Sequence, residues 1–227
     1  MDEALEGLLD DFWLEPDSHV YTLNGGVVPA CTETLSIVRP SLDDIPRKVL
    51  KRATDRGKDV HKAVELRSKN DYDARTGSME IKARMKQWEW FLREYRVRLI
   101  PVDVSLIRQP MLRALFDASR LLVEIPLVHP IYKFGVTADV ALAEIMGRIG
   151  LIEVKATSTH NKATALQTAA QKETINYVFR GVIPPIEVRY GVRLTGVGKP
   201  DVRLYDDETN WMTYLSVLNT YNFIQLP

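Results

Sequence analysis

The apolar residues of this chain follow two spacings, which predict where helices and strands lie. Apolar positions three to four residues apart predict helices over residues 48–68, 80–96 and 164–179, with another after Pro110 and a terminal one over 209–218. Short apolar or alternating runs predict strands over residues 122–128, 134–143, 150–155, 186–194 and 202–205. Helices that precede a strand-rich half with one inserted helix are typical of a mixed α/β sheet.

A hairpin is predicted ahead of these elements. Residues 19–23 alternate between polar and apolar side chains, and Asn24-Gly25-Gly26 is a turn signal before a short return strand. Pro29 and Thr32 then indicate the start of a helix.

Three charged residues lie within the predicted strands. Glu153 and Lys155 are two residues apart, so on a strand their side chains share one face while Val154 points to the other. Asp139 lies fourteen residues before Glu153, and the turn signal at residues 146–148 predicts a hairpin that brings the two carboxylates together.

This set of side chains suggests chemistry on a phosphodiester. Burying opposite charges side by side is costly unless they pair or bind a metal. Two carboxylates with a lysine suit Mg²⁺ or Mn²⁺ and a phosphodiester substrate. The alternative is a surface hairpin that carries an exposed ion pair.

Polar residues at helical spacing flank these strands. Downstream, Gln167 and Gln171 are four residues apart and share a helix face. Upstream, His61 and Glu65 have the same spacing, on a helical stretch that contains Arg56-Gly57.

Taken in order along the chain, these motifs resemble the PD-(D/E)XK nuclease superfamily in its RecB-like and phage exonuclease branch. There, a helical R-G-x-x-x-H-x-x-x-E segment precedes a strand with Gly and the motif Asp, an E-x-K strand and a Gln-bearing helix. The match covers roughly residues 50–180. Two features depart from the branch: Gln171 stands where it usually has Tyr, and residues 101–122 form a longer segment than usual before the motif strands.

The resemblance implies a fold and an activity. The fold would be a restriction-endonuclease-like α/β core, with a mixed central β-sheet flanked by helices and a helical N-terminal layer. The activity would be that of a Mg²⁺- or Mn²⁺-dependent deoxyribonuclease, an exonuclease before an endonuclease, in DNA recombination or processing. A helicase or a single-strand-annealing protein could be its partner on DNA. The alternatives are a structure-specific or nicking endonuclease and a non-catalytic module that binds DNA ends.

The resemblance also implies a role for each motif residue. The metal ligands would be His61, Asp139, Glu153 and the carbonyl of Val154. Lys155 would orient or help deprotonate the attacking water and stabilise charge on the phosphate. Gln167 would hold the lysine, a water or the DNA backbone. Roles stay open for Gln171, which could be a solvated helix residue, for Glu65, for Glu124 on the strand before Asp139, and for His160 and Lys162 in the loop after Lys155.

Composition sets the size and the setting of the protein. Its 227 residues are 45% hydrophobic and 26% charged, which suits one folded domain with a sizeable core. We expect a single nuclease domain over residues 1–227, with residues 1–48 as an N-terminal hairpin and helix appendage and residues 49–227 as the core. The single cysteine, Cys31, excludes an internal disulfide and a four-cysteine zinc or iron–sulfur site.

Charge and hydropathy bear on the partners. The formal net charge is zero, so DNA affinity would need a local basic patch rather than an overall positive field. No apolar run reaches membrane-spanning length, and the acidic start Met1-Asp2-Glu3 does not resemble a signal peptide. We therefore expect a cytoplasmic protein, in a bacterial or phage-infected cell.

Overall fold

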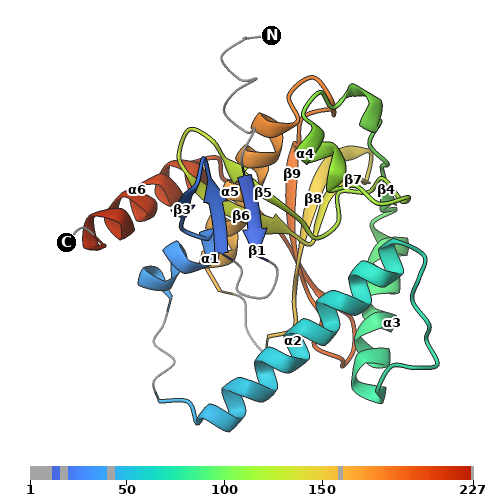
Figure 1. The fold of residues 1–227 in the computed structure, drawn as a ribbon. Coiled ribbons are helices and arrows are strands. Elements are labelled where there is room, and N and C mark those ends of the chain that lie inside the picture. The colour runs from blue at the N-terminus through green and yellow to red at the C-terminus, as the bar shows by residue number, and fades with distance from the viewer. Residues whose placement is uncertain (1–11, 16–19, 40–43, 158–160, 226–227) are drawn as a thin grey trace.

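A five-stranded mixed sheet packed against helices forms the centre of the protein (Figure 1). The structure is a computed structural model that describes residues 12–15, 20–39, 44–157 and 161–225. The strand order in the sheet is β10-β9-β8-β7-β4, and only the β8–β9 pair is parallel. The bounds are β4 Arg98–Leu99, β7 Val140–Ile145, β8 Arg148–Lys155, β9 Val188–Arg193 and β10 Asp201–Leu204.

The parallel pair is joined by the helix α5, Ala163–Val178. Parallel neighbours cannot be joined by a tight turn, so a crossover helix between them is expected. The remaining helices are α1 Cys31–Thr34, α2 Arg47–Ser68, α3 Met79–Glu94, α4 Pro110–Ala114 and α6 Thr209–Ile224, with 3₁₀ turns η2 Leu35–Val38 and η3 Val104–Leu106. The long helices agree with the predicted ranges to within one or two residues, except that α6 continues six residues past the predicted end.

Two buried clusters cover the two faces of the sheet. One joins α2 and α3 to the sheet through residues such as Val64 and Trp88, which pack with Ile152 and Val154 of β8. The other lies on the opposite face, where α5 and α6 meet Leu151 and the smaller sheets. Strand alternation therefore sends neighbouring residues of β8 to different layers.

The predicted strand over residues 134–143 is in fact two strands. β6, Phe134–Ala138, pairs with β5, Ile125–His129, in a sheet of its own, whereas β7 pairs with β8. The break falls at Asp139, whose carboxylate accepts the backbone N–H of Val154. The Asp139 side chain thus accepts a backbone N–H that a backbone carbonyl would accept in a regular β-ladder. The β7–β8 register shifts between Val140 and Ala143.

The N-terminal hairpin packs into the main core. The strands are β1 Phe12–Glu15, β2 Val20–Leu23 and β3 Gly26–Val28, in the order β1-β2-β3; the predicted strand start at His19 lies outside the described residues. Tyr21 packs so closely on Gly135 of β6 that a Cβ there would lie 2.1 Å from its ring. Gly135 also donates its N–H to the carbonyl of Pro29. The hairpin thereby covers the strand that leads to Asp139.

Among the described residues, none of the helices is both long and apolar enough to span a membrane.

Candidate active site

The predicted pairing of Glu153 and Lys155 is present at the end of β8. Both side chains lie on the face of the sheet that α5 covers, whereas Val154 is buried on the other face. Lys155 Nζ donates to Glu153 Oε1 over 2.5 Å. Glu153 is buried and Lys155 is half-buried, so the pair is neither an exposed surface bridge nor sealed from solvent.

Asp139 lies beside this pair, as the hairpin geometry predicts. It is buried at the junction of β6 and β7, and its two carboxylate oxygens have different partners. Oδ2 accepts the backbone N–H of Val154 over 2.5 Å. Oδ1 is 2.8 Å from Nδ1 of His61. The carboxylate is therefore fixed in orientation by one sheet contact and one helix contact.

His61 reaches the site from α2. The neighbouring residues Val60, Ala63 and Val64 are buried against the sheet, which fixes the helix and leaves the half-buried imidazole over Asp139. Nδ1 also lies 3.4 Å from Oε1 of Glu124.

One ligand atom from each of His61, Glu124 and Asp139 can be chosen so that all three lie within 4.8 Å of one another. One imidazole and two carboxylates are a donor set that suits Mn²⁺ and related divalent metals. Glu153 is not a member of this group. Its predicted role as a ligand, and that of the Val154 carbonyl, stay predictions.

The placement of Glu124 differs from the prediction. Glu124 does not lie on a strand: β5 begins at Ile125, and Glu124 has a left-handed φ of 54°. Its N–H donates to the carbonyls of Ala138 and Asp139. This local turn directs the side chain to Asp139 instead of into a strand face. The pattern of apolar residues around Glu124 contains no signal for such a turn.

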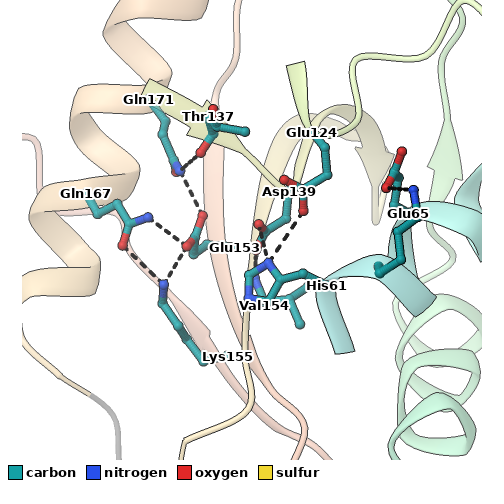
Figure 2. A network of polar contacts seen from close by, with 11 residues as sticks. His61, Glu65, Glu124, Thr137, Asp139, Glu153, Val154, Lys155, Gln167 and Gln171 are labelled. Atoms are coloured by element: carbon teal, nitrogen blue, oxygen red, sulfur yellow. Dashed lines mark hydrogen bonds and ion pairs between the residues drawn. The ribbon is translucent and has the colours of Figure 1, made fainter. Parts of the chain in front are cut away.

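Glu153 is surrounded by donors (Figure 2). Its Oε1 accepts from Lys155 and, over 2.7 Å, from Nε2 of Gln167, while its Oε2 accepts from Nε2 of Gln171 over 2.8 Å. Gln167 Oε1 in turn accepts from Lys155 over 3.2 Å. Gln171 also donates to the carbonyl of Thr137. The interpretation of Gln171 as a solvated residue is therefore wrong: it is buried, and its helix face is the one that meets the site.

Three other candidate residues lie away from the cluster or outside the described residues. Glu65 forms ion pairs with Lys62 and Lys69 and points away from Asp139 (Figure 2). His160 lies outside the described residues. Lys162 is the exposed residue immediately before α5. His61 and Glu65 thus lie one turn apart on the same helix, but His61 contacts Asp139 whereas Glu65 pairs with lysines.

The charged side chains of the site shift one another's pKa values. The carboxylate of Asp139 raises the pKa of His61 well above its usual value. Burial acts to raise the pKa of Asp139, but the charge of His61 and its hydrogen bond outweigh burial and leave that pKa lowered. Burial, followed by the charge of Asp139, raises the pKa of Glu124 to about 7.

The pair on β8 shows the same competition. Burial raises the pKa of Glu153, and the neighbouring Asp139 charge adds to this effect. Burial acts to lower the pKa of Lys155, yet the charges of Glu153 and Asp139 prevail and raise it. Lys155 is therefore a cation at neutral pH, because its pKa lies above a normal value that is already well above 7.

A cavity of about 330 Å³ opens above the cluster. All of the site residues His61, Glu124, Asp139, Glu153, Lys155, Gln167 and Gln171 line it. The N-terminal hairpin and α1 supply another wall with Tyr21, Cys31 and Thr32, and Tyr21 OH lies 2.7 Å from Oγ1 of Thr137. The cavity has room for several waters, or for a hydrated cation and a phosphate group.

The chain matches no protein-family model and none of the curated proteins with which it was compared. The resemblance to nucleases therefore rests on the motif residues alone. A function can be argued only from the arrangement of these residues in the structure.

Proposed function

We propose that this protein is a divalent-metal-dependent deoxyribonuclease that hydrolyses DNA phosphodiester bonds. The observation that carries the proposal is that His61, Glu124 and Asp139 share one cavity with the Glu153–Lys155 pair. An oxygen- and nitrogen-rich ligand set beside a fixed ammonium group matches the needs of phosphodiester hydrolysis.

The ligand set suits Mg²⁺ or Mn²⁺. His61, Glu124 and Asp139 would hold the cation, which when bound would polarise a phosphoryl oxygen and acidify a bound water. The orientation of Asp139 is set by the Val154 N–H, so one oxygen is tied to the sheet and the other faces His61. Glu153 lies next to this set, within the same cavity.

Lys155 has the position of a charge-stabilising group. An ammonium group has three donors. Glu153 and Gln167 accept two of them, which aims the group and leaves one donor for a phosphate oxygen or the attacking water. Because the pKa of Lys155 is raised, its cationic form supports stabilisation of negative charge more than removal of a proton from water.

The proposed reaction is a hydrolysis. A water oxygen forms a bond to phosphorus, and the bond from phosphorus to the leaving sugar oxygen breaks. The water gives up one proton and the leaving oxygen gains one, so no other reactant is consumed. Negative charge grows on the phosphoryl oxygens as the new bond forms, and the Lys155 ammonium is placed to oppose it.

An exonuclease in DNA recombination or processing is the form of this activity that the resemblance favours, with a helicase or single-strand-annealing protein as partner. A structure-specific or nicking endonuclease would use the same cluster. A non-catalytic module that binds DNA ends is disfavoured, because burying Asp139 and Glu153 close to each other costs stability and such a module has no need of both charges.

A comparison of linear DNA with covalently closed circular DNA distinguishes an exonuclease, an endonuclease and a non-catalytic module. We expect degradation of the linear substrate with Mg²⁺ or Mn²⁺, none with EDTA, and an intact closed circle. Relaxation or linearisation of the circle would identify an endonuclease instead. Binding to linear ends without cleavage in any metal would refute the nuclease proposal, provided that Asp139→Asn and the wild-type protein give the same result.

A further inference from the structure

A second and larger cavity lies between the end of α2 and the outer side of α3. Its volume is about 910 Å³, and none of the described residues that line it also lines the cavity of the candidate active site. Its apolar floor contains Tyr72, Met79, Met85 and Trp90. We call this cavity the α2–α3 groove.

Met85 belongs to the buried core, and Tyr72 and Trp90 pack against that core, whereas Met79 lies outside it. Met79 is the first residue of α3, after the Ser78 side chain has capped the helix, and 82% of its surface is exposed. Most of its side chain is therefore available to contact a partner. Methionine is common on surfaces that bind peptides, because its flexible side chain adapts to different apolar partners.

The rim of the α2–α3 groove is basic. Lys82, Lys86 and Arg93 come from α3, four and then seven residues apart, which places them along one side of the helix. Arg67 joins them from α2, and it pairs with Glu89, the one acidic side chain among the described residues that line the groove. The whole chain has no net charge, so this positive rim is a local concentration and not part of a general excess.

We infer that the α2–α3 groove binds an acidic segment of a partner protein. Apolar side chains of that segment would lie on the floor, and its carboxylates would face the basic rim. From Lys82 to Arg93 the helix rises about 16 Å, which an extended segment covers with about five residues. Charge complementarity of this kind sets specificity and speeds association.

A single DNA strand suits the groove less well. Strand binding without sequence preference relies on aromatic faces on which bases stack. The Nζ of Lys199 lies 5.0 Å from the centre of the Trp90 ring, so one face of this tryptophan is already covered. The methionines of the floor offer no stacking surface, whereas they pack readily on leucine or phenylalanine.

Fluorescence anisotropy with a labelled peptide tests this inference. The probe is a synthetic peptide of about twelve residues in which aspartates alternate with leucine and phenylalanine, mixed with the full chain in EDTA. We expect saturable binding that the double variant Lys86→Glu/Arg93→Glu weakens about tenfold or more, and that Met79→Ser also weakens. Lys48→Glu, an exposed charge reversal on α2 outside the groove, should bind as the wild type does.

Several results would overturn the inference. These are the absence of binding up to about 100 µM, equal affinity of the double variant, and equal affinity of a peptide whose apolar residues are replaced by serine. Binding of a labelled twelve-nucleotide single strand in place of the peptide, lost in the double variant, would assign the groove to DNA. Self-association lost in the same variant would assign it to a second copy. None of these readouts depends on DNA cleavage, so a negative result for the groove leaves the nuclease proposal unaffected, and the reverse also holds.

Discussion

The two ends of the β5–β6 hairpin sheet place a histidine in opposite surroundings. At one end, beside Glu124 and Asp139, His61 lies in a charged cluster that holds its pKa well above the usual value. The other end of the sheet lies four residues further along β5, a distance of about 14 Å. There, burial lowers the pKa of His129 to about 4. The rings around His129 are Tyr132, Phe134, Tyr177 and Trp211.

The comparison shows that the charge of its neighbours decides which form of a histidine is favoured, whether the ring is half-buried as in His61 or buried as in His129. Charged neighbours favour a positive charge at His61, either a proton on the ring or a cation bound beside it. Aromatic neighbours keep His129 neutral, with its Nδ1 accepting the N–H of Tyr132, and make it part of the core. Under the proposed function, changes at the charged end should therefore alter DNA cleavage, whereas changes at the aromatic end should alter stability.

Removing the ammonium at the charged end should have the largest effect. Lys155→Ala is expected to lower DNA cleavage roughly 10²- to 10⁴-fold, because charge on the phosphate loses its nearest stabilising group. The melting temperature should stay close to that of the wild type, and Asp139→Asn should behave alike. Cleavage rates with Mg²⁺, together with thermal melts, provide the measurement. A variant that unfolds but cleaves normally in its folded fraction would make the cluster structural.

Truncation at the aromatic end should have the reverse pattern. His129→Ala leaves a cavity among four aromatic rings and is expected to cost about 2 to 4 kcal/mol of the free energy of unfolding. Cleavage per folded molecule should be unchanged. Urea unfolding measures the first quantity and active-site-normalised rates the second. His129→Phe, which refills the space, is the matched control and should restore most of the stability.

Acidification should weaken the wild-type protein through His129. Its pKa is about 4 in the folded state and near 6.5 when unfolded, so the unfolded chain takes up the proton first. The free energy of unfolding that His129 contributes is therefore fully present above about pH 6.5 and is lost as pH falls through about 4. Between about pH 7 and pH 5, urea midpoints should drop further for the wild type than for His129→Phe. Equal drops would contradict the lowered pKa.

A metal titration tests the charged end without reference to stability. His61→Ala should raise the Mn²⁺ concentration needed for half-maximal cleavage by about tenfold to a hundredfold, because one nitrogen ligand is removed. Glu65→Gln lies one turn along the same helix but outside the cluster, so its titration should match the wild type. Identical curves for His61→Ala and the wild type would remove His61 from the metal site.

The smallest expected effect concerns Gln171. In Gln171→Leu, Oε2 of Glu153 and the carbonyl of Thr137 lose their shared donor, which should cost about 1 to 2 kcal/mol of stability and up to about tenfold in cleavage. Gln171→Glu would keep the shape but add a carboxylate against Glu153, and it should be worse than the leucine in both respects. A leucine variant that matches the wild type would show that Glu153 is held by Lys155 and Gln167 alone.

The sequence by itself determined the parts of the site that depend on local geometry. Strand alternation placed Glu153 and Lys155 on one face with Val154 behind them, and the hairpin brought Asp139 beside them. The long helices were predicted closely, because their apolar spacing reflects a single buried face. The helix that carries His61 was among them. These features follow from backbone periods that act over a few residues.

Only the tertiary structure decided the rest. Glu124 reaches Asp139 through a left-handed turn, Gln171 is buried under Glu153, and Tyr21 closes the cavity from a hairpin more than a hundred residues away in sequence. The split of the predicted strand at Asp139 has the same origin, since it depends on the Val154 N–H. Each of these features arises from contacts between distant segments, which no local pattern of apolar and polar residues records.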